Sequence, residues 1–180
     1  TVPTELGDKR IRDLLMQYAV PAIIAMTASS LYNMVDSIYI GHIKDVGSYA
    51  ISGLAVTFPL MNLATALGTL VGVGASTILS MLLGQRNYKA ANKVLLNEVL
   101  LNIIIGLAFS AVTLSFLDPI LMFFGASQNT LPFARDYMVI ILLGNVITHL
   151  YFGLNNMVRA SGNPKLAMGL TVFTVVSNTI

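Results

Sequence analysis

The chain has 180 residues, of which 56% are hydrophobic and only 10% are charged, and its mean hydropathy is +0.78. Soluble domains carry about 25% charged residues, so this composition excludes an ordinary soluble domain and indicates a membrane protein. The chain has no cysteine, which excludes disulfides and thiolate metal sites within it.

The first predicted transmembrane helix covers about residues 13–43, with Pro21 in its first third. No charged side chain lies between Asp13 and Asp36, a longer stretch than the roughly 20 apolar residues that a helix needs to cross a bilayer. Asp36 is the exception, in the stretch LYNMVDSIYIG. A charged side chain at this depth costs about 2.5–3.5 kcal/mol, so we expect Asp36 to face a protein interior or a water-filled cavity.

Polar residues surround Asp36 on one arc of this helix. At about 100° per residue, the arc contains Ser29, Tyr32, Asn33, Asp36 and Tyr39. A carboxylate in such surroundings can exchange a proton or bind a hard cation such as Na⁺. The alternative is an interhelical hydrogen bond of structural value only, but such bonds average about 0.6 kcal/mol in membranes. We therefore interpret Asp36 as a functional residue.

The second predicted helix covers about residues 54–84. No charge occurs between Asp45 and Arg86, and a straight helix of that length would reach roughly 60 Å. We therefore assign residues 46–53 to a loop or a short surface helix. Gly68 and Gly72 have the GxxxG spacing, which is typical of close helix packing.

The third and fourth helices are predicted at about residues 94–116 and 131–158. On the third, we interpret Glu98 as an interfacial charge, which leaves Asp36 as the only buried acid. On the fourth, Asn145 and His149 lie on one polar side. Together with Tyr32 and Tyr39 they are candidates for the wall of a substrate cavity, although a lone histidine such as His149 on a polar helix face is more often a simple hydrogen-bonding residue.

The fifth helix is predicted at residues 164–180 and begins at Pro164, whose missing N–H costs nothing at a first helical position. It is still apolar at Ile180, so we expect it to continue beyond the end of this sequence. Thr171, Thr174 and Asn178 share one face of it, and this polar stripe requires a polar partner inside the bundle.

The distribution of lysine and arginine predicts the orientation of the chain. Alternate crossings place eight of the 10 basic residues on one side and two on the other. The two sets are Lys9, Arg10, Arg12, Arg86, Lys89, Lys93, Arg159 and Lys165, and Lys44 and Arg135. By the positive-inside rule, we expect a multi-pass protein of the plasma (inner) membrane with a cytoplasmic N-terminus.

Sequence motifs for enzymatic chemistry are missing from this chain. It contains no GxxxxGK[ST] loop, no HExxH and no pair of carboxylates placed for hydrolysis. We therefore expect no enzymatic activity and no cofactor. An ion-coupled transporter accounts for one buried acid on a polar face better than a passive channel does, but a channel remains an alternative.

Four stretches of the sequence resemble the MATE (multidrug and toxic compound extrusion) family. These are VPAIIAMTASSLYNMVDSIYIGHI, AISGLAVTFP, GVGASTILSMLLGQRNYKAANKV and NNMVRASGNPKLAMGLTVFTVVSNTI. The resemblance implies an all-α membrane fold of twelve helices in two lobes, of which residues 1–180 would form five helices of the N-terminal lobe, without the second lobe. It also implies export of cationic, amphipathic small molecules in exchange for H⁺ or Na⁺.

The resemblance also assigns roles to individual residues. Asp36 and Asn178 match the family's coupling site, and we add their neighbours Asn33 and Thr174 to it. If Na⁺ is the coupling ion, Asp36 would be its ligand. No other metal site is expected in this chain. Pro21 matches a proline that is associated with helix bending. Ser161 stands where similar members often have an acid, so no role is assigned there.

The implied mechanism is that an incoming cation neutralises Asp36, the first helix bends near Pro21 and the lobe cavity expels its cargo. The expected partners are a cationic substrate, the lipid bilayer and the remaining helices of the protein, without nucleic acid. Two alternatives remain: a related flippase for lipid-linked cargo, and a structural membrane fragment. The flippase would be expected to line its cavity with arginine and lysine, and the lack of either residue in mid-membrane of this segment counts against it.

Overall fold

The computed structural model describes residues 10–42 and 47–179, except for the side chains of Asn33, Asp36, Asn178 and Thr179. The described residues form helices and connecting turns, without strands. The helices are α2 (Ile11–Gly41), α3 (Gly47–Gly84), α4 (Tyr88–Ser115), α5 (Leu117–Phe123), α6 (Leu131–Ala160) and α7 (Pro164–Thr179). Four of these, α2, α3, α4 and α6, are long and apolar enough to cross a membrane, and α7 is a shorter apolar helix.

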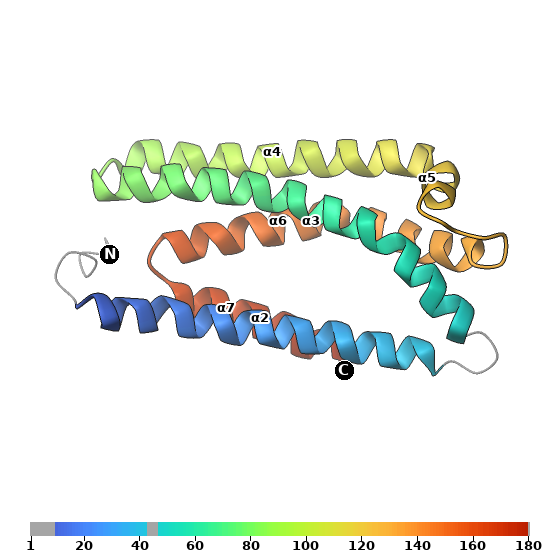
Figure 1. The fold of residues 1–180 in the computed structure, drawn as a ribbon. Helices are drawn as coiled ribbons and strands as arrows, with labels where there is room; N and C mark the ends of the chain where they lie inside the picture. The colour runs from blue at the N-terminus through green and yellow to red at the C-terminus, as the bar shows by residue number, and fades with distance from the viewer. Residues whose placement is uncertain (1–9, 43–46, 180) are drawn as a thin grey trace.

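Successive long helices run in opposite directions (Figure 1). Helices α2, α4 and α7 run one way, and α3 and α6 return. The α3–α4 and α6–α7 connections consequently lie at the end of the bundle where α2 begins. Gly162 makes the second of these turns with a φ of 89°, a conformation that glycine adopts without steric cost. This alternation agrees with the crossings that the charge distribution predicts.

Three elements differ from the prediction: the start of α3, the start of α4, which lies at Tyr88 rather than at about residue 94, and the short helix α5. Residues 47–53 do not form a loop: α3 is one continuous helix from Gly47 to Gly84. The predicted loop followed from the length that a straight helix would have, but Pro59 lies inside α3. Proline can kink a helix without ending it when neighbouring helices support it. In Figure 1, the first turns of α3 lean toward the end of α2. The short helix α5 was not predicted at all.

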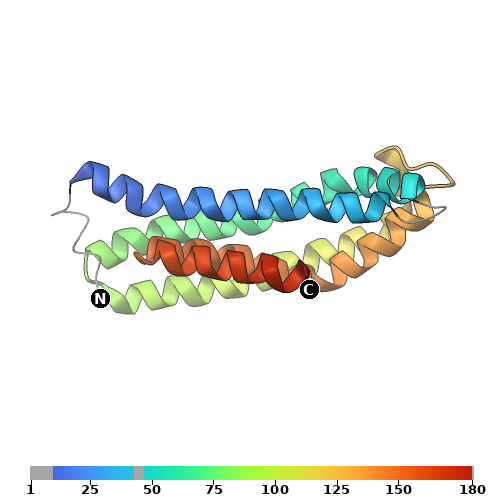
Figure 2. The same cartoon turned by 90° about the horizontal axis from the view of Figure 1, so that it is seen from below.

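The helices form two groups. Helices α3, α4 and α6 pack against one another as a three-helix unit, and α2 packs against α7 as a pair. Contacts between α6 and α7 and between α2 and α3 join the pair to the unit. Figure 2 views the molecule from the side of the pair, with α2 and α7 in front of α3 and α4.

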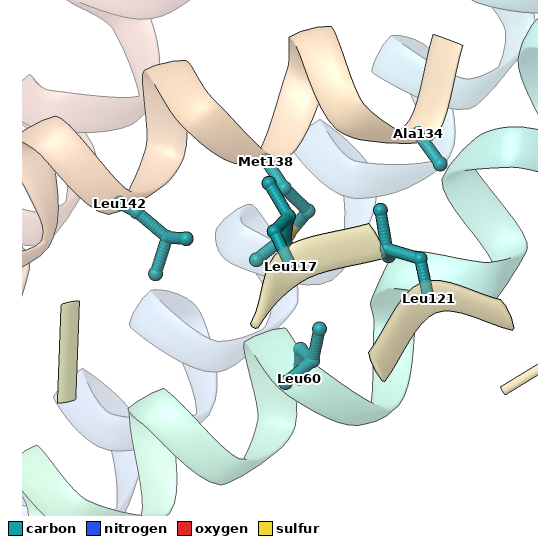
Figure 3. Packing of buried hydrophobic residues seen from close by; sticks show 6 residues of the cluster. All are labelled: Leu60, Leu117, Leu121, Ala134, Met138 and Leu142. Atoms are coloured by element: carbon teal, nitrogen blue, oxygen red, sulfur yellow. The ribbon is translucent and has the colours of Figure 1, made fainter. Parts of the chain in front are cut away.

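Apolar clusters hold the two ends of the three-helix unit. At one end, a cluster from α3, α5 and α6 contains Leu60, Leu117, Leu121, Ala134, Met138 and Leu142 (Figure 3). At the other end, Leu79, Ala91 and Met157 form a smaller cluster from α3, α4 and α6. Between these clusters, the interior of the unit contains several buried polar side chains beside apolar residues such as Ala64 and Val71.

Candidate functional site: a cavity and a buried polar seam

A cavity of about 490 Å³ lies between the α2–α7 pair and the three-helix unit. Its walls come from four helices, α2, α3, α6 and α7. The lining residues are Ala25, Met26, Ser29, Ser30, Thr69, Tyr151, Phe152, Asn155, Asn156, Arg159 and Thr171. This mixture of apolar, aromatic and hydrogen-bonding groups is typical of sites for small organic molecules.

Hydrogen bonds between α6 and α7 fix one wall of the cavity. The hydroxyl of Tyr151 donates to Thr171 Oγ1 over 2.9 Å, and the Asn155 amide donates to the Ala167 carbonyl over 3.2 Å. Arg159 in turn donates to Asn155 Oδ1 over 3.2 Å. These bonds hold the aromatic ring of Tyr151 and the guanidinium of Arg159 at the surface of the cavity.

The predicted cation-coupling residues are only partly described. Position 36 lies in α2 and positions 174 and 178 lie in α7, but the side chains of Asp36, Asn33 and Asn178 are outside the described part of the chain. The Thr174 hydroxyl donates to the Leu170 carbonyl of its own helix over 2.9 Å and is exposed. Pro21 is buried inside α2.

The four residues predicted to line a substrate cavity lie in different places. Tyr39 is 72% exposed, and Tyr32 is half-buried on the same helix. Asn145 and His149 are each 1% exposed and do not line the cavity described above. They lie inside the three-helix unit because α4 covers the side of α6 that carries them.

Asn145 and His149 belong to a row of buried polar groups that we call the polar seam. The seam consists of Glu98, Asn102 and Ser110 on α4 and Asn145 and His149 on α6. The interpretation of Glu98 as an interfacial charge is therefore wrong: its side chain is 2% exposed. The sequence did hold a signal, because Glu98, Asn102, Gly106 and Ser110 recur every four residues, which places them on one face of a helix.

One half of the seam is fully connected by hydrogen bonds. Asn145 Nδ2 donates to Ser110 Oγ over 3.2 Å and to the Gly106 carbonyl over 3.3 Å. Ser110 Oγ donates to the Leu142 carbonyl over 2.9 Å. These bonds join α4 to α6 directly across the interior of the unit.

The other half of the seam has polar atoms without partners. Asn102 Nδ2 donates to Glu98 Oε1 over 2.5 Å. Glu98 Oε2, Asn102 Oδ1 and both ring nitrogens of His149 are buried without a hydrogen-bond partner in the described part of the chain. Buried polar groups in proteins are nearly always hydrogen-bonded, so these four atoms together require an explanation.

Glycines allow the three helices to approach closely around the seam. A Cβ added at Gly68 would lie 3.3 Å from the Cα of His149, and one at Gly72 would lie 2.8 Å from the Cα of Gly153. A Cβ at Gly153 would collide with the carboxylate of Glu98 and the amide of Asn102. The prediction that the GxxxG spacing serves packing is confirmed.

Comparisons with known proteins place this arrangement in a family. The MatE family model matches residues 21–180, so the chain belongs to the MatE family and is a multi-pass membrane protein. Over 154 residues it is 32% identical to a protein named multidrug export protein MepA of Staphylococcus aureus (strain MSSA476) and 31% identical to one of the same name from Staphylococcus haemolyticus (strain JCSC1435). Each match covers 86% of this chain and 34% of the relative, so the chain spans about a third of their length.

The fold is also similar to that of solved MATE transporters. The structure of the MATE multidrug transporter DinF-BH matches 98% of this chain and 39% of its own, with a TM-score of 0.87 and 31% sequence identity. A crystal structure of a MATE protein in the straight conformation matches 89% of this chain and 35% of its own, with a TM-score of 0.82 and 24% identity. The predicted family and the predicted all-helical membrane fold, as a part of a larger transporter, are both confirmed.

Proposed function

We propose that the intact protein is a secondary active antiporter that exports cationic, amphipathic compounds in exchange for H⁺ or Na⁺. The observation that carries this proposal is the match to the MatE family over residues 21–180. The names of the relatives support it, because they are multidrug export proteins. The similarity to DinF-BH, which is described as a multidrug transporter, supports it as well.

The cavity between the α2–α7 pair and the three-helix unit is the proposed cargo site in this part of the protein. Met26 and Phe152 supply apolar surface, while Ser29, Thr69 and Asn156 supply hydrogen-bonding groups. An amphipathic molecule can bury its rings against the former and bond its polar edge to the latter. The four residues that the sequence suggested for substrate contact do not line this cavity; they are Tyr32, Tyr39, Asn145 and His149. They remain candidates only for substrate contacts outside it.

The proposed coupling group lies farther along the α2–α7 pair. Position 36 follows Ser29 by seven residues, and position 178 follows Thr171 by seven; both Ser29 and Thr171 line the cavity. Seven residues are about two helical turns, so each position returns to the face of its helix that carries the cavity-lining residue. Because α2 and α7 pack together and run in the same direction, Asp36 and Asn178 are suited to share one cation.

Exchange follows if the cation and the cargo favour different conformations of the α2–α7 pair. A ligand shifts a conformational equilibrium only by the difference in its affinity for the two states. We propose that a cation binds at Asp36, with Asn33, Thr174 and Asn178 as the other candidate coupling residues. The bound cation favours a state in which α2 bends at Pro21. That bend reduces the cavity and releases the cargo.

Ethidium binding to the intact protein in lipid nanodiscs tests the cargo site. Thr69→Trp places a large ring in the cavity and is expected to weaken binding about tenfold or more, equivalent to at least about 1.4 kcal/mol. Thr77→Trp is the matched control, because Thr77 is exposed on the same helix and does not line the cavity. Equal affinities of the two variants would remove the cavity from the proposal.

A second candidate function is export of a lipid-linked, anionic cargo, and Arg159 is the observation that favours it. Among the residues that line the cavity, Arg159 is the one with a charged side chain, and arginine binds phosphate groups well. Arg159→Gln in the same assay separates the two candidates. Ethidium binding that is retained or strengthened supports a cationic cargo, whereas competition of a polyisoprenyl phosphate with ethidium in the wild type but not in Arg159→Gln supports the lipid-linked cargo.

A further inference from the structure

Glu98 is the most deeply buried acid among the described residues, and the proposed antiport does not use it. Its side chain is 2% exposed, and the hydrogen bond that it receives comes from Asn102 on its own helix. The second carboxylate oxygen, Oε2, is buried without a partner in the described part of the chain. An ionised carboxylate in this setting would be a buried charge with half of its hydrogen-bonding capacity unused, which is strongly unfavourable.

The described helices around Glu98 bring no cation to it. Residues 47–84, which form α3, contain no aspartate, glutamate, lysine, arginine or histidine. On α4 itself, Lys93 is exposed. On α6, Arg159 is bonded to Asn155 and lines the cavity on another side of the helix. His149 is the remaining titratable group of α6 in the seam, and neither of its ring nitrogens has a partner among the described residues.

The described residues around Glu98 do not form a metal-ion site, because no group of three or more His, Cys, Asp or Glu side chains is placed to hold one, and the packing is tight on the side of Gly153. A methyl group at Gly153 would overlap both the Glu98 carboxylate and the Asn102 amide, and the side chains of Asn102 and His149 are 0% and 1% exposed. A proton is the one cation that can neutralise a carboxylate without occupying volume. The proton also converts Oε2 from a hydrogen-bond acceptor into a donor. In the same seam, Asn102 Oδ1 has no hydrogen-bond donor within the described part of the chain.

We infer that Glu98 is a proton-binding site, located inside the three-helix unit and separate from the proposed cation-coupling group on α2 and α7. In this site Glu98 holds one proton on Oε2 when the unit is packed as described. Loss of that proton to solvent leaves a negative charge between α4 and α6, which only a separation of these helices can hydrate. The site therefore links proton release to the packing of α4 against α6.

Infrared spectroscopy of the intact protein in a detergent without ester carbonyl groups tests this inference without any transport reaction. A protonated carboxylic acid has a C=O stretching band that carboxylates and amides lack. We expect the wild type to show this band at neutral pH and Glu98→Gln to lose the intensity of one carboxyl group. The matched control is Asp36→Asn, which is expected to retain the Glu98 band whether or not Asp36 couples transport.

Two further arms keep the test decisive. If Glu98→Gln does not fold, Glu98→Asp serves instead, because a retained acid with a shorter side chain is expected to shift the band rather than remove it. Addition of Na⁺ at constant pH is expected to leave the band unchanged. A wild type without the band, a band unaffected in both Glu98 variants, or a band that Na⁺ removes would each overturn the proposal of a proton site.

Discussion

The missing side chain at Gly153 is what allows α6 to lie against Glu98 and Asn102 of α4. A Cβ at this position would overlap both polar groups, and neither can move into solvent because both are buried. Gly72 of α3 meets Gly153 from the other side. One residue without a side chain therefore sets the spacing of all three helices at the level of the acid.

Gly153→Ala is consequently expected to destabilise the protein by about 1–3 kcal/mol, the usual cost of forcing an extra carbon into a packed interior. Thermal unfolding of the intact protein in detergent measures this change. Gly144→Ala is the control on the same helix, since no atom lies within 4 Å of a Cβ added there, and alanine is favoured over glycine in a helix by up to about 1 kcal/mol. Equal unfolding temperatures for the two variants would contradict the packing described here.

The sequence indicates Asp36 but not Glu98 as a buried acid because the burial of Glu98 depends on contacts between helices. Asp36 attracts attention because its neighbours in sequence are apolar, whereas Glu98 follows Lys93 closely and resembles an interfacial charge. Burial of Glu98 depends on Gly153, which is 55 residues away in sequence and meets it only in the folded unit. Spacing indicates that Glu98, Asn102 and Ser110 share a face, but not which helix covers that face.

At the level of whole helices, charge and hydropathy predict the positions of the long helices better than their bends or the short helices between them. Hydropathy located the four long apolar helices of the described residues, since apolar length is set by the bilayer. It failed at the start of α3, where a helix of 38 residues stays continuous with Pro59 inside it. It also missed α5, whose seven residues are too few to show a helical period. Neither bending nor short helices leave a clear mark in apolar run length.

Pro21 offers the corresponding test on α2. Alanine at this position restores a backbone N–H and straightens the helix, so Pro21→Ala is expected to lower gradient-driven efflux several-fold while ethidium affinity stays near that of the wild type. Ile23→Ala, at a 61% exposed position two residues away, is the control and should transport normally. Efflux of Pro21→Ala at the wild-type rate would show that transport does not depend on bending at this residue.

At the scale of the whole molecule, the two groups of helices have different tasks in this account. The three-helix unit is tied together by direct hydrogen bonds across its interior, whereas the α2–α7 pair borders a cavity. The proposed antiport needs one part that moves and one that supports it, and the proposed coupling group lies on the pair. The family and the membrane fold were predictable from the sequence, because sequence motifs and hydropathy encode them locally.

We expect transport by the intact protein to be coupled to a cation gradient through Asp36. The most direct measurement is ethidium efflux from vesicles that contain the intact protein, driven separately by a proton gradient and a sodium gradient. Wild type, Asp36→Asn and the control Asp13→Asn, at the first turn of the same helix, are compared. We expect efflux that depends on one of the two gradients, is lost in Asp36→Asn and is retained in Asp13→Asn. Efflux that ignores both gradients, or that survives Asp36→Asn unchanged, would contradict this expectation.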